Sequence, residues 1–169
     1  MIIAPDNFRD EELFVTKNIL EKAGFQVEVA AKKKGLIKGV MGGQIQVEKD
    51  FKELNLTNYQ ALVFIGGPGT RQYFTDQQVL NIAQKAAQQQ MLLAAICIAP
   101  VILGNAGLLV SKKATVWSST EDQSYIDKIV QNGQAIYTQE NVVVDDLIIT
   151  ANGPAAAPQF ARAITKALK

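Results

Sequence analysis

The single cysteine, Cys97, is the side chain in this sequence best suited to nucleophilic chemistry. It directly follows the apolar run 91–96, and Pro100 comes three residues later, where proline favours the first turn of a helix. This pattern predicts a sharp turn from a buried strand into a helix, with the thiol facing the helix N-terminus. Unpaired N–H groups and the helix dipole there favour the thiolate, which is the nucleophilic form. A free cysteine can equally be an inert buried side chain, so position alone leaves both interpretations open.

Histidine is absent from all 169 residues. Its absence removes the Ser-His-Asp triad, the Cys-His dyad and the usual Cys/His zinc sites, and leaves carboxylates, lysines and tyrosines for proton transfer. One cysteine also cannot form an intramolecular disulfide. We therefore expect no metal and no cofactor.

The loop Gly66-Gly67-Pro68-Gly69 follows an apolar run. It lacks the lysine of a phosphate-binding loop and the spacing of a dinucleotide fold, which disfavours nucleotide binding. Glycines allow backbone N–H groups to approach a neighbouring site closely, as an oxyanion hole requires. The alternative is a tight loop with no further role.

Three carboxylates, Asp10, Glu11 and Glu12, open the first predicted helix, where they complement the helix dipole. A carboxyl group that turned inward beside a thiolate would have a raised pKa and could shuttle protons. Periodicity does not indicate which of the three turns inward.

The elements that must position these residues alternate along the chain. Strands are predicted at 1–4, 26–30, 61–65, 92–96, 114–116 and 147–150, and helices at 10–23, 76–90, 100–106, 124–131 and 155–168. Residues 35–47 and 142–149 indicate two hairpins, the second turning at Asp145-Asp146. Strand and helix in alternation predict an α/β fold, a mostly parallel sheet with helices on both faces. Ligands of such sheets bind beyond the carboxyl ends of the strands.

Composition favours one cytoplasmic domain over residues 1–169. A formal charge of +1 lacks the basic excess that nucleic-acid binding requires, and we assign Lys32-Lys33-Lys34 to a solvated loop. No stretch approaches the roughly 18 apolar residues of a membrane span, and the N-terminus does not resemble a signal peptide.

Four segments together resemble the ThiJ/PfpI family, also called the DJ-one superfamily, which has a class I glutamine amidotransferase-like fold. They are Phe8-Arg9-Asp10-Glu11-Glu12-Leu13, Ile65-Gly66-Gly67-Pro68-Gly69, Ala95-Ile96-Cys97-Ile98-Ala99-Pro100 and Ile149-Thr150-Ala151-Asn152-Gly153-Pro154. The resemblance implies a flavodoxin-like three-layer α/β/α sandwich, usually a homodimer or higher homo-oligomer, with a nucleophile-elbow cysteine.

The same resemblance implies a catalytic pair, Cys97 and a protonated Glu12, with Glu12 favoured over Glu11 because it stands twelve residues before Gly24. It also implies an oxyanion hole formed by the N–H groups of Gly67 and Ile98. Further residues are expected to line the site: Gly66, Pro68, Trp117, Asn152, Gly153 and Pro154.

The sequence departs from the family pattern at Ile98, where members labelled proteases and many glyoxalases carry histidine. Trp117 stands near the place of another histidine in some relatives. Peptide hydrolysis needs a proton for the departing amine, which these side chains cannot supply. A PfpI-type protease or amidase is therefore disfavoured, and a glutaminase is set aside for the same reason.

Two hypotheses of different classes remain beside an inert scaffold. In the leading one, Cys97 and Glu12 act without a cofactor on small reactive carbonyls, as a glyoxalase or deglycase does. In the other, Cys97 senses oxidation in a redox-responsive stress protein, because accessible cysteines of low pKa oxidise most readily.

Overall fold

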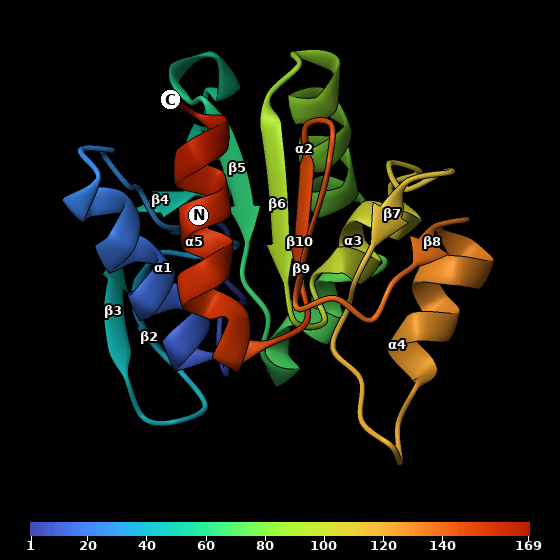
Figure 1. The fold of residues 1–169 in the computed structure, drawn as a ribbon. Helices are drawn as coiled ribbons and strands as arrows, with labels where there is room; N and C mark the ends of the chain where they lie inside the picture. The colour runs from blue at the N-terminus through green and yellow to red at the C-terminus, as the bar shows by residue number, and fades with distance from the viewer.

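A mostly parallel sheet lies at the centre of the protein, in a computed structural model that describes residues 1–169 (Figure 1). Its four main strands, in spatial order, are β5 (Ala61–Phe64), β6 (Leu92–Ile96), β10 (Ile148–Ala151) and β9 (Val142–Asp145). β5, β6 and β10 are parallel, and β9 is an antiparallel edge strand. Ile2 bridges to Phe64 and to Ala30, which joins β5 to the short parallel pair β1 (Ala30–Ala31) and β4 (Lys49–Asp50).

Helices cover both faces of this sheet, which confirms the α/β sandwich (Figure 1). The helices are α1 (Asp10–Lys22), α2 (Gln77–Gln88), α3 (Pro100–Asn105), α4 (Ser124–Asp127) and α5 (Ala157–Ala167). α1 packs against α5 on one face, while α2 and α3 pack together on the other. Single turns of 3-10 helix run over Phe51–Glu53, Leu56–Asn58 and Pro154–Ala156, a longer one runs over Pro68–Tyr73, and a π-helical segment covers Lys128–Asn132.

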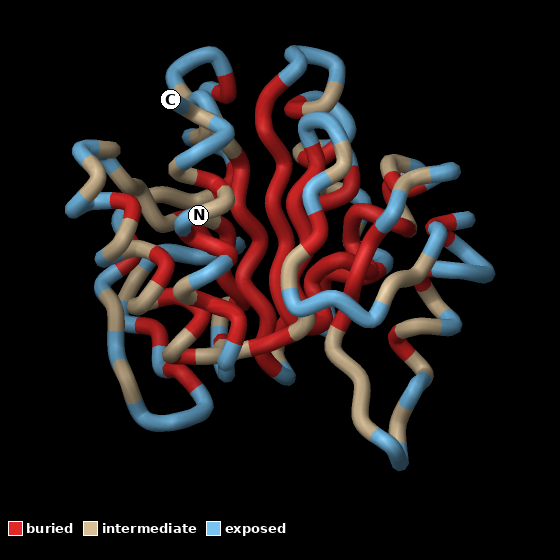
Figure 2. Tube along the Cα trace, in the orientation of Figure 1, coloured by how far each residue is buried: buried red, intermediate tan, exposed pale blue.

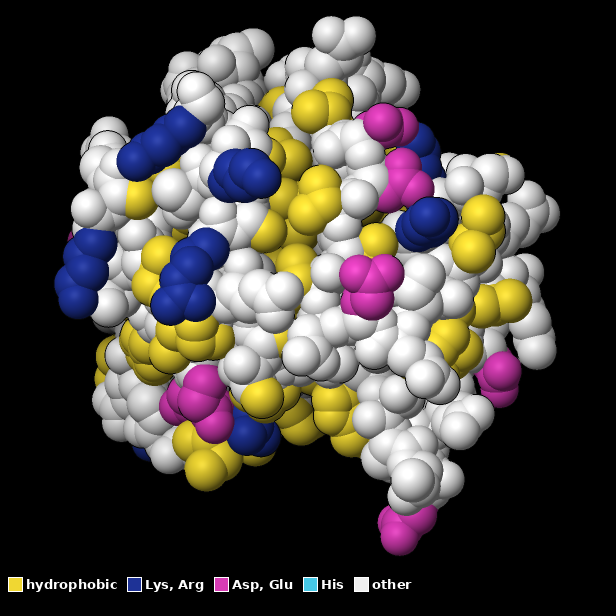
Figure 3. All heavy atoms as spheres, in the orientation of Figure 1, with side chains coloured by type: hydrophobic (Ala, Val, Ile, Leu, Met, Phe, Trp, Pro, Cys, Tyr) yellow, Lys and Arg dark blue, Asp and Glu magenta, His cyan; other side chains and the backbone are white.

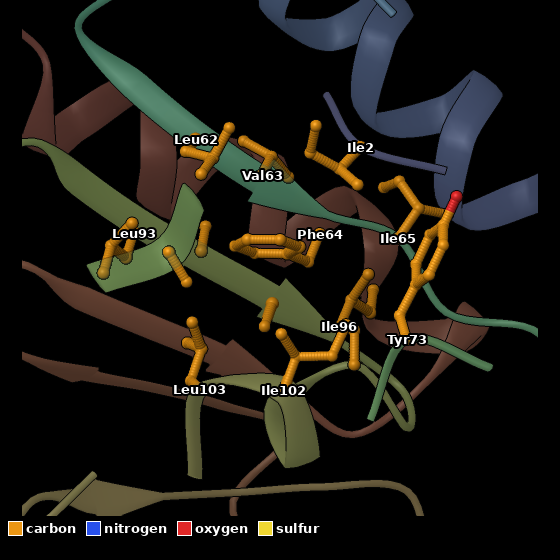
Figure 4. Close-up of a cluster of buried hydrophobic side chains, with 14 of the residues drawn as sticks. Ile2, Leu62, Val63, Phe64, Ile65, Tyr73, Leu93, Ile96, Ile102 and Leu103 are labelled. Carbon is orange, nitrogen blue, oxygen red and sulfur yellow. The ribbon is translucent and has the colours of Figure 1, made fainter. Parts of the chain in front are cut away.

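The sheet is buried because its strands are apolar on both faces. All five residues of β6 are buried, as expected for a central parallel strand covered by helices (Figure 2). Phe64, Ile96 and Ile102 meet between the sheet and α3 (Figure 4). Tyr73 is also buried, and its hydroxyl donates to the Ile3 carbonyl oxygen at 3.0 Å, so its polar atom is satisfied.

Several predicted elements differ in extent from those observed. Residues 1–4 join the sheet through the single bridging residue Ile2, and the strand predicted at 26–30 is reduced to β1. The strand predicted at 114–116 appears as β7 (Lys113–Ala114), which pairs with β8 (Ile136–Tyr137) outside the main sheet. Both predicted hairpins form, the first from β2 (Gly35–Lys38) and β3 (Gln44–Val47), the second from β9 and β10.

The helix predicted at 124–131 continues from α4 into the π-helical segment. Just beyond it, a Cβ built on Gly133 would lie 2.7 Å from the Gly104 Cα in α3. The two backbones therefore touch at a pair of glycines, an approach that sequence periodicity does not reveal.

The surface carries no single dominant charge on the face drawn in Figure 3, where basic, acidic and apolar side chains are interspersed. No helix of the protein has the length and apolar character needed to cross a membrane.

Candidate active site

Cys97 lies in a strained turn directly after β6. Its φ of +64° places it in the left-handed region, which is unfavourable for a residue with a side chain. Two hydrogen bonds hold the turn: the Cys97 N–H donates to the Ala151 oxygen and the Trp117 N–H donates to the Cys97 oxygen, both at 2.8 Å. α3 then begins at Pro100. The geometry is that of a nucleophile elbow, with the thiol at the carboxyl end of the sheet.

Glu12 is the carboxylate that turns inward, which answers the question left open by the sequence. Its side chain is 0% exposed, and Oε2 accepts a hydrogen bond of 2.9 Å from the Gly66 N–H. Glu11 is instead half-buried and pairs with Arg9 at 2.9 Å. Asp10 accepts from the N–H groups that follow β2, those of Met41 at 2.8 Å and Gly43 at 2.6 Å, so it anchors the hairpin loop.

Gly66 lies against both Glu12 and Cys97 and leaves no room for a side chain. A Cβ built there would lie 2.6 Å from the Cys97 Cβ and 2.7 Å from Glu12 Oε2. Gly67 has a φ of +108°, and a Cβ on it would lie 2.4 Å from the backbone nitrogen of Arg9. Both glycines therefore allow the first helix, the loop after β5 and the elbow to meet at one point.

Burial dominates the electrostatics of the Glu12 carboxyl group. It raises the pKa of Glu12 to about 8, while contact with Cys97 and the Gly66 N–H oppose the shift. Oε1 of Glu12 is buried without a conventional hydrogen-bond partner. Glu12 therefore carries a proton at neutral pH.

The Cys97 pKa is raised as well, first by burial and then by the neighbouring Glu12. The N–H groups of Gly67 and Ile98 oppose this rise, so both donate toward the sulfur. From the sequence, we expect the helix N-terminus to favour the thiolate and lower the Cys97 pKa. This expectation is wrong, because the net shift of the Cys97 pKa is upward. Desolvation of an 8% exposed thiol outweighs the two N–H groups. Glu12 and Cys97 are a coupled pair, and their burial makes the loss of even the first proton unfavourable.

The other residues predicted around the site lie in segments next to the elbow and the Gly67 loop; we call these segments the rim (Pro68, Trp117 and 152–154). Trp117 is half-buried, and a Cβ on Gly153 would lie 3.2 Å from its Cδ1. Asn152 is held by Asn141, through N–H to O at 3.0 Å and Nδ2 to Oδ1 at 3.1 Å. Two prolines begin 3-10 turns, the exposed Pro68 after Gly67 and the half-buried Pro154 after Gly153.

Two residues beside this rim went unrecognised in the sequence, Tyr125 and Arg71. The Arg71 Nε donates to the Tyr125 hydroxyl at 2.7 Å, and the Tyr125 ring packs edge-on against Trp117 at 5.8 Å. They are 54 positions apart in the chain, and neither belongs to a motif, so only the fold brings them together.

A metal role has no ligand set, because no three Cys, Asp or Glu side chains gather in a group that could hold an ion. What the site offers is a thiol, a protonated carboxyl group in contact with it, and two N–H donors. These parts suit addition of sulfur to a carbonyl carbon with proton transfer to oxygen.

Comparison with known proteins gives one consistent result. The sequence model of the DJ-1/PfpI family matches residues 1–167. An uncharacterized protein of Methanocaldococcus jannaschii is 37% identical over 100% of this chain and 81% of its own length. A deglycase of Pyrococcus abyssi is 30% identical over 100% and 98%, and a glutathione-independent glyoxalase of Caenorhabditis elegans is 25% identical over 100% and 87%. Among solved structures, a ThiJ/PfpI domain protein from Brachyspira murdochii superposes with a TM-score of 0.92 at 33% identity, over 99% of this chain and 93% of that one.

Proposed function

The chain belongs to the DJ-1/PfpI family, and from that premise we propose that it is a cofactor-independent glyoxalase or deglycase acting on small reactive carbonyls. Cys97 is the nucleophile, Glu12 carries protons, and the N–H groups of Gly67 and Ile98 hold the developing oxyanion. Relatives named as deglycases and as a glyoxalase support this class of activity.

The observation that carries the proposal is the protonated Glu12 beside Cys97. A buried carboxyl group with a pKa of about 8 holds a proton that it can give to a substrate oxygen and take back near neutral pH. No histidine is then needed for a reaction in which one proton moves between sulfur, carbon and oxygen. This accounts for an active elbow followed by Ile98.

With methylglyoxal, the steps follow from this geometry. The pair first releases one proton to solvent, which gives the Cys97 thiolate beside the protonated Glu12. The Cys97 sulfur bonds to the aldehyde carbon, the carbonyl electron pair moves to oxygen, and Glu12 gives that oxygen its proton, which makes a hemithioacetal and leaves Glu12 a carboxylate. Glu12 then moves the proton of that carbon to the neighbouring carbon while the hydroxyl proton passes to the neighbouring oxygen, which leaves a thioester. Water releases lactate and restores the thiol.

The test measures lactate formed from methylglyoxal by the purified protein. We expect turnover by the wild type and its loss in Cys97→Ser and Glu12→Gln. A wild-type rate no higher than that of Cys97→Ser would overturn the proposal.

A second candidate, oxidation sensing at Cys97, is favoured by the same protonated Glu12, because it can donate a hydrogen bond to an oxidised sulfur. Two equivalents of peroxide would convert the thiol to a sulfinate with a gain of two oxygens. Intact mass after mild peroxide tests it. A clean gain of two oxygens on Cys97 supports sensing, and unselective methionine oxidation without a change at Cys97 contradicts it.

A further inference from the structure

Two aromatic side chains, Trp117 and Tyr125, pack against each other next to the Cys97 elbow. The backbone N–H of Trp117 donates to the Cys97 carbonyl oxygen, which places the Trp117 backbone next to the elbow. The rings of Trp117 and Tyr125 meet edge to face, with centroids 5.8 Å apart and planes at 73°. Tyr125 therefore lies one aromatic ring beyond Trp117.

Two cations converge on the Tyr125 ring. The Arg71 guanidinium carbon is 5.8 Å from the ring centroid and the Lys128 Nζ is 5.5 Å from it. Neither forms an ion pair with a carboxylate within 4 Å, unlike Arg9, Lys49 and Lys112. Arg71 also belongs to the 3-10 segment that begins directly after Gly67, one of the two donors to the sulfur. Arg71 is thus connected to the site through the chain that follows Gly67, and both cations are connected to it through the Tyr125 and Trp117 rings.

The nearest acidic group only partly offsets them. Asp122 is influenced by both Lys128 and Arg71, but its carboxylate hydrogen-bonds to Ser124. Glu121 and Asp127 lie on the same stretch of chain, are exposed and form no ion pair. Because none of these carboxylates pairs with Arg71 or Lys128, both cations remain available to a carboxylate on a ligand.

We propose that Arg71 and Lys128 select carbonyl substrates carrying a carboxylate several bonds away from the reacting carbon. The inference rests on the proposed function and names the substrate class of that site. The separation follows because the cations lie one aromatic ring beyond Trp117. The Arg71 fork keeps its terminal nitrogens for the two oxygens of a carboxylate while Nε binds Tyr125. The Cys97 sulfur adds to the aldehyde carbon and Glu12 protonates the oxygen, as with methylglyoxal.

The test measures alkylation of Cys97, the only cysteine of the chain, because its rate with a charged reagent depends on the charges near the thiol. The rate of alkylation by anionic iodoacetate is divided by that of neutral iodoacetamide, and each is normalised to glutathione. We expect this ratio to fall at least about threefold in the double variant Arg71→Gln/Lys128→Gln. It should rise in Asp122→Asn, and 0.5 M NaCl should reduce all differences. Lys22→Gln, at the far end of α1, is the matched control and should leave the ratio unchanged.

Arg71→Lys separates charge from packing, since it keeps the charge but loses the hydrogen-bonding fork. It should retain most of the wild-type ratio, whereas a merely structural role would make it resemble Arg71→Gln. Succinic semialdehyde should also protect Cys97 from iodoacetamide at lower concentrations than butanal does, and the double variant should lose this preference.

An unchanged ratio in the double variant, or equal protection by the two aldehydes, would overturn the inference. Loss of lactate formation with the alkylation ratio preserved would instead reject the proposed function alone.

Discussion

Glu12 and Glu28 lie near opposite ends of the central sheet, and their carboxyl groups meet opposite surroundings. Glu12, at the carboxyl ends of the strands, is fully buried and forms no ion pair, and its pKa is raised to about 8. Glu28, at the amino ends, accepts hydrogen bonds from Lys49 at 2.8 Å and from the Tyr59 hydroxyl, and these lower its pKa. The same type of side chain thus has a raised pKa at one end of the sheet and a lowered pKa at the other.

The protein has a hollow at the Glu28 end. A cavity of about 370 Å³ opens there, lined by Met1, Leu20, Phe25, Gln26, Val27, Glu28, Lys49, Asn58, Tyr59, Gln60, Ala61, Val63, Ile164 and Leu168. Its charged side chains, Glu28 and Lys49, are paired with each other, whereas Glu12 forms no ion pair. The two ends therefore differ in how their carboxyl groups are compensated.

The largest expected difference between the two ends is in catalysis. Glu12→Gln should lower the rate of lactate formation at least about 100-fold, because the amide cannot carry the proton. The matched change Glu28→Gln should leave the rate within about twofold. Equal losses in the two variants would remove the functional distinction between the ends.

The pH dependence of stability should also differ between them. Folded Glu12 keeps its proton up to about pH 8, while the unfolded chain releases it near 4.5, so the native state is penalised progressively as pH rises between these values. Glu12→Gln lacks this penalty. The free energy of unfolding of Glu12→Gln, relative to that of the wild type, should therefore increase from pH 5 to pH 8. The increase should reach about 3 kcal/mol at pH 8.

Urea unfolding of both proteins at pH 5 and pH 8 measures this difference. Glu28→Gln should show no such trend between pH 5 and pH 8, because a lowered pKa stabilises the native state above the unfolded value of 4.5 and this benefit is lost only on acidification below it. A pH-independent difference for Glu12→Gln would mean that Glu12 is ionised in the folded protein.

Gly66→Ala tests the close contact at the Glu12 end. The added methyl group would overlap Cys97 and Glu12, so we expect a loss of about 1 to 3 kcal/mol in stability together with most of the activity. Gly107→Ala is the control, since its φ of +76° gives strain but no atom lies within 4 Å of the added Cβ. It should destabilise the protein by about 1 kcal/mol and leave the activity of the folded protein intact.

The smallest effect is expected for the ion pair at the other end. Lys49→Met should change the free energy of unfolding only slightly, because the Lys49 and Glu28 side chains are 38% and 37% exposed and water screens their attraction. Chemical denaturation at low and high salt measures it. A loss of several kcal/mol would show that the amino end depends on charge pairing as strongly as the core depends on packing.

The sequence predicted the alternation of elements because β6 and its neighbours are continuous apolar runs, and the glycines and Cys97 could be placed after the strands. The choice between Glu11 and Glu12 could not be made from periodicity, since three carboxylates follow one another at the helix start. It depends on Gly66, 54 positions away, which donates its N–H to Glu12. The net rise in the Cys97 pKa could not be predicted from the sequence either, because the local pattern shows the N–H donors but not how deeply the thiol is buried.

The most direct test of the coupled pair is the pH dependence of Cys97 alkylation by iodoacetamide, followed by intact mass in wild type and Glu12→Gln. We predict that wild-type reactivity rises as the pair loses its first proton, with an apparent pKa of about 8. In Glu12→Gln the rise should move to higher pH, because the buried thiol must then ionise without a carboxyl group to take its proton. Identical profiles in the two proteins, or no alkylation of either below strongly alkaline pH, would contradict the account.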